Sequence, residues 1–164
     1  MPPRAVYRLR RRQWVPVGVR ETFAFFARPE NLALITPPWL GFTVLTPGPI
    51  AMRRGLLLDY RLRILGAPMR WRSEITEYDP PFGFRDEQVI GPYRSWVHRH
   101  RFRSEQGGTE IEDDVVYEVP LGLIGMLANR LVVRPLLEAI FDFRRREIER
   151  RLRPPGDAGP ANWP

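Results

Sequence analysis

The sequence predicts an α+β fold: a curved antiparallel sheet of six to seven strands wraps around one long C-terminal helix, with two short helices near the N-terminus. Residues 56–119 alternate between apolar and polar side chains, and turn sequences divide them into short segments. From 121 to 152, apolar residues instead recur at three- and four-residue steps. Such a sheet has one apolar face, and only the final helix is long enough to cover it.

The first 38 residues predict a strand and two short helices. Residues 5–15 are strand-like, and the apolar-rich segment 20–27 is typical of a helix. Pro29 stands in the first turn of the second helix, Glu30 to Ile35, where proline is tolerated. The run Thr36-Pro37-Pro38 ends that helix.

The middle of the chain predicts consecutive antiparallel hairpins, because each strand-like segment is followed by a tight turn. The turn sequences are Gly66-Ala67-Pro68, Gly91-Pro92 and Gln106-Gly107-Gly108. The expected strands are residues 56–64, 69–76, 84–90, 93–104 and 109–119.

The last element is predicted to be one amphipathic helix of about eight or nine turns over residues 121–152. Pro135 removes a backbone donor inside it, so we expect a kink or break near residues 131–134. The predicted organisation is an N-terminal extension (1–4), a single domain (5–153) and a disordered Pro/Gly-rich tail (154–164).

Composition excludes several classes of chemistry. All 26 basic residues of the 164-residue chain are arginine, which excludes Schiff-base, Walker-lysine and kinase-type mechanisms. The absence of cysteine excludes disulfides, thiolate metal sites and a cysteine nucleophile. The N-terminal residues lack the apolar stretch of a secretory signal, so a cytoplasmic location is expected.

Alternation in the fourth and fifth hairpin strands places polar groups inside the fold. The even positions from Trp96 to Phe102 face inward, and so do the odd positions from Ile111 to Val119. If Phe102 pairs with Thr109, His98 lies opposite Asp113, whereas a two-residue slip places His100 there. Either register sets an imidazole beside a buried carboxylate.

The predicted inner surface is mostly apolar with a few polar groups, a combination typical of small-molecule sites. Asp86 and Gln88 are placed inward on the third hairpin strand, although a bulge at Gly91-Pro92 would shift their phase. The candidate ligand-binding residues are Tyr60, Trp71, Asp86, Gln88, Trp96, His98, His100, Asp113 and Tyr117.

Seven short strings occur in a fixed order along the chain: Phe23-Ala24-Phe25-Phe26, Pro29-Glu30-Asn31-Leu32, Thr36-Pro37-Pro38-Trp39, Phe84-Arg85-Asp86-Glu87-Gln88, Gly91-Pro92-Tyr93, Trp96-Val97-His98-Arg99-His100-Arg101-Phe102 and Asp113-Asp114-Val115-Val116-Tyr117. Taken together in order and spacing, they resemble the SRPBCC superfamily, which includes START, Bet v 1 and polyketide cyclase proteins. The resemblance is to its bacterial ligand-binding subgroup and covers residues 5–153. It implies a helix-grip fold with a deep hydrophobic cavity that binds or transports lipids, sterols or aromatic polyketides, and some relatives are aromatase/cyclases.

The candidate residues leave alternatives open. The histidines could tie strands together, bind a ligand, act as an acid/base pair or hold a metal ion with Asp113. In the enzyme alternative, a cyclase/dehydratase-type catalyst, the catalytic residues are His98, His100 and Asp113. No cofactor or metal is predicted, and the expected partner is a hydrophobic small molecule.

The arginine clusters, such as residues 144–146, are interpreted as a solvated helix face. Contact with an anionic membrane or with an acidic partner protein is the alternative. No nucleic-acid partner is expected, because no recognition helix, zinc finger or RNA-binding string is present.

Overall fold

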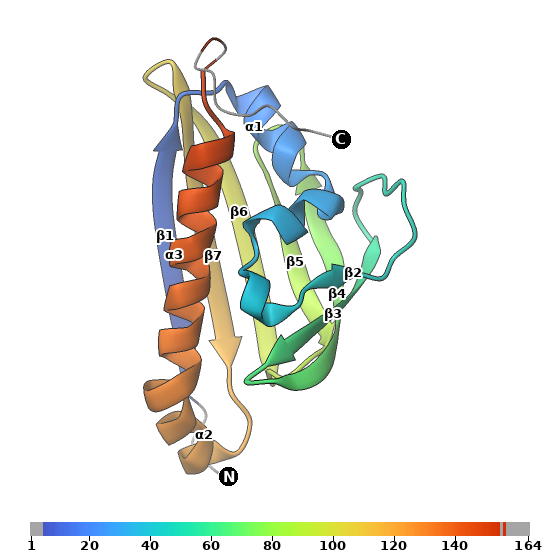
Figure 1. The fold of residues 1–164 in the computed structure, drawn as a ribbon, viewed down its shortest axis with the longest axis vertical. Coiled ribbons are helices and arrows are strands. Elements are labelled where there is room, and N and C mark those ends of the chain that lie inside the picture. Colours follow the sequence, from blue (N-terminus) through green and yellow to red (C-terminus); the bar gives the residue numbers. More distant parts are fainter. Residues whose placement is uncertain (1–4, 155, 157–164) are drawn as a thin grey trace.

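The computed structural model describes residues 5–154 and 156, and it confirms the predicted architecture. Seven antiparallel strands form one curved sheet in the order β1-β7-β6-β5-β4-β3-β2, with the C-terminal helix across one face (Figure 1). Residues 1–4 and nearly all of the predicted tail lie outside the described residues. The strands are β1 (Val6–Val15), β2 (Thr43–Val44), β3 (Leu57–Ile64), β4 (Ala67–Asp79), β5 (Gly83–Ile90), β6 (Ser95–Glu105) and β7 (Gly108–Glu118).

Two tight turns set the geometry of the meander. Leu65 and Gly66 join β3 to β4 with φ values of 49° and 82°, so the turn lies one to two residues earlier than predicted. Gln106 and Gly107 join β6 to β7 with φ values of 48° and 75°. Positive φ at both central residues is typical of the type I′ turn, whose twist matches that of the strands.

The β6–β7 turn corrects the expected register. With only two residues in the turn, Glu105 pairs with Gly108, so Phe102 pairs with Ile111 and not with Thr109. His100 therefore lies directly opposite Asp113, as in the two-residue slip considered above. The first-choice pairing of His98 with Asp113 is wrong as a backbone register.

The predicted break in the last helix is confirmed as a π-helical turn. Helix α2 (Gly122–Ala128) continues into a π segment, Asn129–Val133, and then into α3 (Arg134–Arg151). Pro135 stands in the first turn of α3, directly after the π segment, where its ring and missing N–H interrupt the α-helical hydrogen-bond pattern. The Tyr117 hydroxyl donates a 2.9 Å hydrogen bond to Asn129 Oδ1, which ties the π segment to the sheet.

The N-terminal helices close one side of the space between the sheet and α3 (Figure 1). Helix α1 (Val19–Phe26) is followed by the 3₁₀ segment η1 (Pro29–Ile35), so both predicted short helices are present. The short elements η2 (Pro38–Leu40) and β2 were not predicted, because two or three residues carry no periodic signal. Within the described residues, no helix is both long and apolar enough to span a bilayer.

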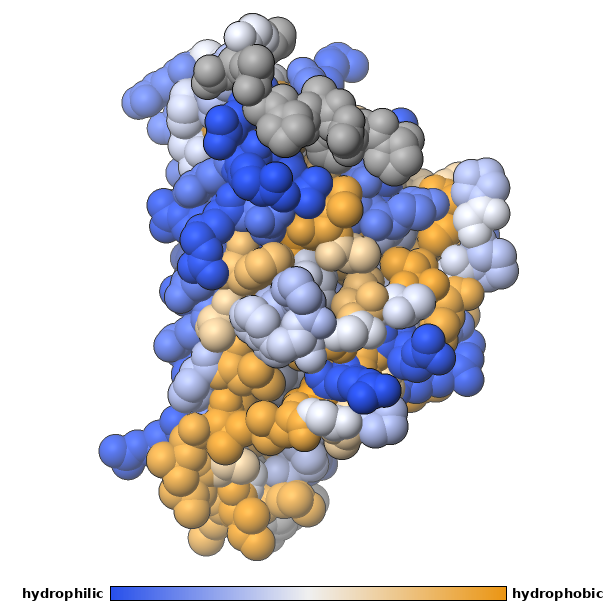
Figure 2. Space-filling view, in the orientation of Figure 1, coloured by the Kyte–Doolittle hydropathy of each residue, from blue (hydrophilic) through white to orange (hydrophobic). Residues whose placement is uncertain are grey.

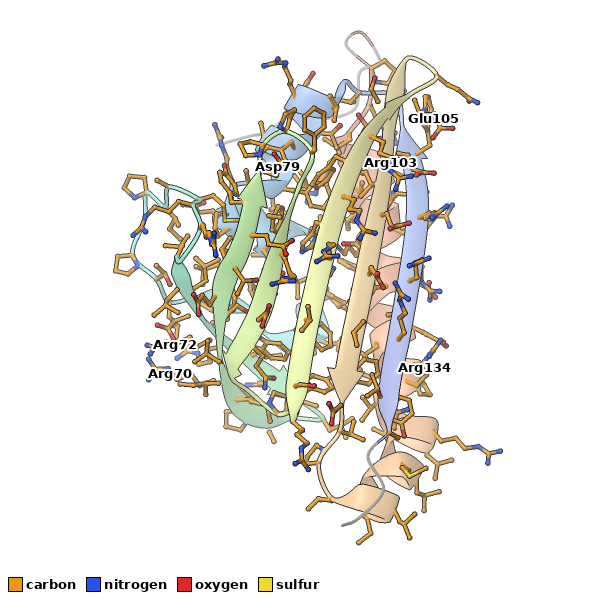
Figure 3. The ribbon with its side chains drawn as sticks, turned by 180° about the vertical axis from the view of Figure 1, so that it is seen from behind. Arg70, Arg72, Asp79, Arg103, Glu105 and Arg134 are labelled. Atoms are coloured by element: carbon orange, nitrogen blue, oxygen red, sulfur yellow. The ribbon has the colours of Figure 1, made fainter. Side chains whose placement is uncertain are left out.

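The outer face of the sheet carries many charged side chains (Figure 3). Its arginines form ion pairs with carboxylates on neighbouring strands. The Glu112 carboxylate, whose side chain is 3% exposed, forms ion pairs with the guanidinium groups of Arg12 and Arg101, each with a nitrogen–oxygen distance of 2.6 Å. Asp59 accepts both ends of the Arg72 guanidinium at 2.9 Å. The arginine-rich strands therefore present ladders of ion pairs in which a carboxylate such as Glu112 or Asp59 is shared by two arginines, and the opposite face of the sheet holds the apolar core.

Candidate functional site

A cavity of about 200 Å³ lies between the sheet, α3 and the N-terminal helices. Its walls are mainly apolar, with contributions from η1, β3, β4 and α3. Leu40, the last residue of η2, and Phe42, which follows it, also contribute. Polar groups enter it from β5, β6 and α3. The polar wall residues from these three elements are Asp86, His98, His100 and Arg144.

Six of the nine predicted site residues line this cavity. The sheet alternation inferred from the sequence brings them together, because all six project from the covered face. They are Tyr60, Trp71, Asp86, Trp96, His98 and His100.

The other three predicted residues are placed elsewhere. Gln88 does not line the cavity; it brackets the turn after β5, donating to the Tyr93 carbonyl at 2.8 Å and accepting from the Tyr93 N–H at 3.3 Å. Tyr117 is fully buried against Asn129. Asp113 stands behind the histidines, so it acts on the cavity through them.

The two histidines lie between two carboxylates. His98 Nε2 donates to Asp113 Oδ1 at 2.9 Å, and His100 Nε2 donates to Asp86 Oδ2 at 3.1 Å. His100 Nδ1 lies 3.0 Å from the same Asp113 oxygen, and the two imidazole centroids are 3.8 Å apart. The nitrogen His98 Nδ1 is 3.8 Å from Asp86 Oδ2, beyond hydrogen-bond distance.

The environment of this cluster shifts the pKa values of the two histidines in opposite directions. Burial, and then the neighbouring His100, hold the pKa of His98 below its ordinary value. Burial also acts to lower the pKa of His100, but the nearby Asp113 and Asp86 carboxylates outweigh it and leave that pKa raised. These opposite shifts favour His100 over His98 as the first of the pair to take up a proton.

The carboxylates stay ionised despite their burial. Burial alone would raise the pKa of Asp113, but Arg144 and the two imidazoles hold it well below its ordinary range. The pKa of Asp86 is also lowered, because the hydrogen bond from His100 and the charges nearby outweigh its burial. The side chain of Asp86 is 18% exposed, which is consistent with its place in the cavity wall.

Arg144 was missed by the sequence interpretation, which placed it on a solvated face. It is 8% exposed, and its guanidinium lies over the rings of Phe26 and Phe141 at 5.6 and 5.7 Å. A usable signal was present: Leu137, Phe141, Arg144 and Ile148 follow one another at four-, three- and four-residue steps, so Arg144 interrupts the apolar stripe of the helix.

Asp86, His98 and His100 offer ligand atoms within 4.8 Å of one another and could hold a metal ion. This set differs from the metal alternative above, which used Asp113. Each of the three side chains is already in a hydrogen bond of the cluster. The nearby Arg144 cation further disfavours a second positive charge at this position.

Residues 15–144 match the model of a protein family described as polyketide cyclase / dehydrase and lipid transport. The chain belongs to this family. This places it in the SRPBCC superfamily, as the resemblance indicated, and supports hydrophobic ligand binding at the level of the family. Among curated proteins, none matches the sequence.

Solved structures of low sequence identity share the family fold. Protein CV1439 from Chromobacterium violaceum superposes with a TM-score of 0.68 at 12% identity, covering 90% of this chain and 98% of its own. The major latex-like protein 151 of Panax ginseng gives 0.66 at 13% identity, covering 91% and 99%. Protein TTHA0849 from Thermus thermophilus gives 0.65 at 20% identity, covering 89% and 97%. These similarities show the helix-grip fold of the family.

Proposed function

We propose that this family member binds or carries a hydrophobic or amphipathic small molecule in the cavity between the sheet and α3. The observation that carries the proposal is a mainly apolar cavity whose wall includes the cluster of Asp86, His98, His100 and Arg144. Such a site solvates a ligand's apolar body and orients one polar end. The proposed ligand contacts are the six predicted residues that line the cavity.

The size of the cavity limits the ligand. Its volume of about 200 Å³ lies below the roughly 300–1,000 Å³ typical of drug-sized sites. A compact aliphatic or aromatic molecule fits this volume better than a sterol does. A larger ligand would require η1, or the segment that carries Leu40 and Phe42, to move outward.

Filling the cavity tests this proposal. Ile140 lines the cavity from α3, and Ile140→Trp adds a bulky ring there. We expect its affinity for the neutral fluorescent probe N-phenylnaphthylamine to fall about tenfold or more, because apolar contact area is lost to the probe. The matched control is Ile124→Trp on α2, where Ile124 is 71% exposed. Equal probe affinity in both variants and the wild type would contradict internal binding.

The enzyme alternative, a cyclase/dehydratase-type catalyst, has one specific observation in its favour. His98 donates through Nε2 to Asp113, which orients the ring and leaves Nδ1 as a base. In a catalyst, His98→Ala or His100→Ala loses turnover while ligand affinity is kept. In a carrier, the same substitutions change affinity or stability only.

We further propose peripheral contact with an anionic membrane, on a surface different from the arginine clusters. The α2 cap, defined as Leu121, Leu123, Ile124, Leu127 and Leu131, exposes each side chain by 58–75%. Figure 2 shows hydrophobic residues gathered at the end of the molecule where α2 lies. No acidic residue occurs from 119 to 137, and Arg130 is exposed beside the cap. An apolar face with basic residues suits an anionic lipid surface.

Vesicle sedimentation tests the membrane contact. We expect the wild type to bind vesicles that contain phosphatidylglycerol and to bind pure phosphatidylcholine vesicles more weakly. The double variant Leu123→Glu/Ile124→Glu should lose about tenfold or more of the affinity for the phosphatidylglycerol vesicles. Phe82→Glu is the control, because Phe82 is 57% exposed in the β4–β5 turn. Equal binding by the double variant would contradict the proposal, and so would a wild-type protein that dimerises through the cap and ignores vesicles.

No nucleic-acid partner is proposed. The arginines on the outer face of the sheet are largely engaged by carboxylates, as Arg8 is by Asp114 and Arg85 by Glu77. Basic side chains in such pairs are not free to neutralise phosphates.

A further inference from the structure

Arg144 has unused hydrogen-bonding capacity inside the cavity. None of its nitrogens donates a hydrogen bond to a residue that the structure describes, and its buried Nε is among the unpartnered atoms. Its nearest carboxylate oxygen, Asp113 Oδ2, lies 3.8 Å from Nε, beyond hydrogen-bond distance. Arg144 also lines the cavity, so a bound molecule can reach it.

A buried guanidinium without acceptors is costly, and the best acceptor for its planar fork of N–H groups is a carboxylate. The rings of Phe26 and Phe141 cover the guanidinium without accepting conventional hydrogen bonds from it. We infer that the cavity selects ligands that carry a carboxylate, and that Arg144 binds this carboxylate while the histidine pair takes up a proton. The inference rests on the proposed function and specifies the ligand class for the same site.

The proton uptake follows from the balance of charges in the cluster. With His100 protonated, the positive charges of Arg144 and His100 offset the negative charges of Asp86 and Asp113. A ligand carboxylate adds one uncompensated negative charge, which favours a proton from solvent on His98. The groups facing His98 are Asp113 from β7, Asp86 from β5, His100 from β6 and Phe141 from α3. Arg144 of α3 lies beside Asp113.

A series of probes of equal chain length tests the assignment by calorimetry: octanoate, octanol and methyl hexyl ketone. We expect the wild type to prefer octanoate to octanol by about 10- to 100-fold, the range for a charge-assisted hydrogen bond. Arg144→Met should abolish this preference while octanol still binds. Arg145→Met is the control, because Arg145 is the next residue on α3, is 58% exposed in its side chain and pairs with Glu149.

The pH dependence gives a second readout that a structural role for Arg144 would not move. As the pH is lowered from about 8 towards 6, octanoate stays ionised while the proton that its binding places on His98 becomes easier to supply, so octanoate affinity should rise and octanol affinity should stay level. Titrations in buffers of different ionisation enthalpy should show proton uptake with octanoate alone.

The outcomes separate this inference from the proposed function. Equal wild-type affinity for octanoate and octanol, or a preference that survives in Arg144→Met, overturns the role of Arg144 but leaves cavity binding intact. Failure of all three probes to bind the wild type overturns the proposed function itself. If Arg144→Met does not fold, Arg144→Lys replaces it: the charge remains but the bidentate fork is lost, so an undiminished preference contradicts the assignment.

Discussion

Asp113→Asn is expected to lower the free energy of unfolding by about 3–5 kcal/mol, the cost typical of removing one partner from a buried ionic cluster. Asp113 lies 2.9 Å from His98 Nε2, 3.0 Å from His100 Nδ1 and 3.8 Å from Arg144 Nε. The amide keeps the shape of the side chain but removes one of the two negative charges, Asp86 and Asp113, that offset His100 and Arg144. Urea unfolding followed by tryptophan fluorescence measures the change.

The free energy of unfolding should also depend on pH in a way that identifies Asp113. Because the folded pKa of Asp113 lies well below its ordinary value, its stabilisation is present above about pH 4 and is lost as the pH falls through the folded pKa. The wild type should therefore lose stability more steeply in acid than the variant. Asp142→Asn is the control, since this carboxylate of α3 is 58% exposed and, among the described residues, pairs only with Arg11, at 3.4 Å. A loss for Asp113→Asn within 1 kcal/mol (order of magnitude) of the control would contradict the account.

Gly83→Ala is expected to destabilise the fold by about 2 kcal/mol or more, through overpacking at a close contact between strands. Gly83 pairs with Arg101, and a Cβ atom on Gly83 would collide with the carbonyl oxygen of His100. The obstacle is backbone, so β5 must move away from β6. The Asp86–His100 hydrogen bond joins the same two strands, so we also expect weaker ligand binding.

Thermal unfolding of Gly83→Ala beside Gly18→Ala checks this. Gly18 precedes α1 with φ of −61°, and a Cβ atom there would meet nothing within 4 Å, so its substitution should change stability by less than about 0.5 kcal/mol. Equal melting temperatures for the two variants would show that β5 and β6 can separate without cost.

Strong periodicity explains what the sequence predicted correctly. The alternation in β6 and β7 identified His98, His100 and Asp113 as inward-facing, and all three are buried. Pro135 located the break in the last helix, which the structure shows as the π segment. Both inferences depend on local chemistry, which one sequence reveals.

The missed features depend on contacts between distant residues or on small shifts in turns. The two-residue turn at Gln106-Gly107 moved the β6–β7 register by two, and the longer connection assumed at first hid this. Gln88 has the alternation of an inward residue, yet the turn after β5 recruits it to Tyr93. Arg144 was grouped with its charged neighbours, although its spacing from Phe141 and Ile148 places it on the buried stripe.

Native mass spectrometry of freshly purified protein, followed by organic extraction, tests the central claim most directly. We predict that the wild type and Ile124→Trp carry or take up a compact hydrophobic molecule, that Ile140→Trp does so much less, and that the extract is enriched in carboxylic acids. A wild type that emerges with the mass of the bare chain and takes up none of the added octanoate, octanol or N-phenylnaphthylamine would contradict the claim that this cavity is a ligand site.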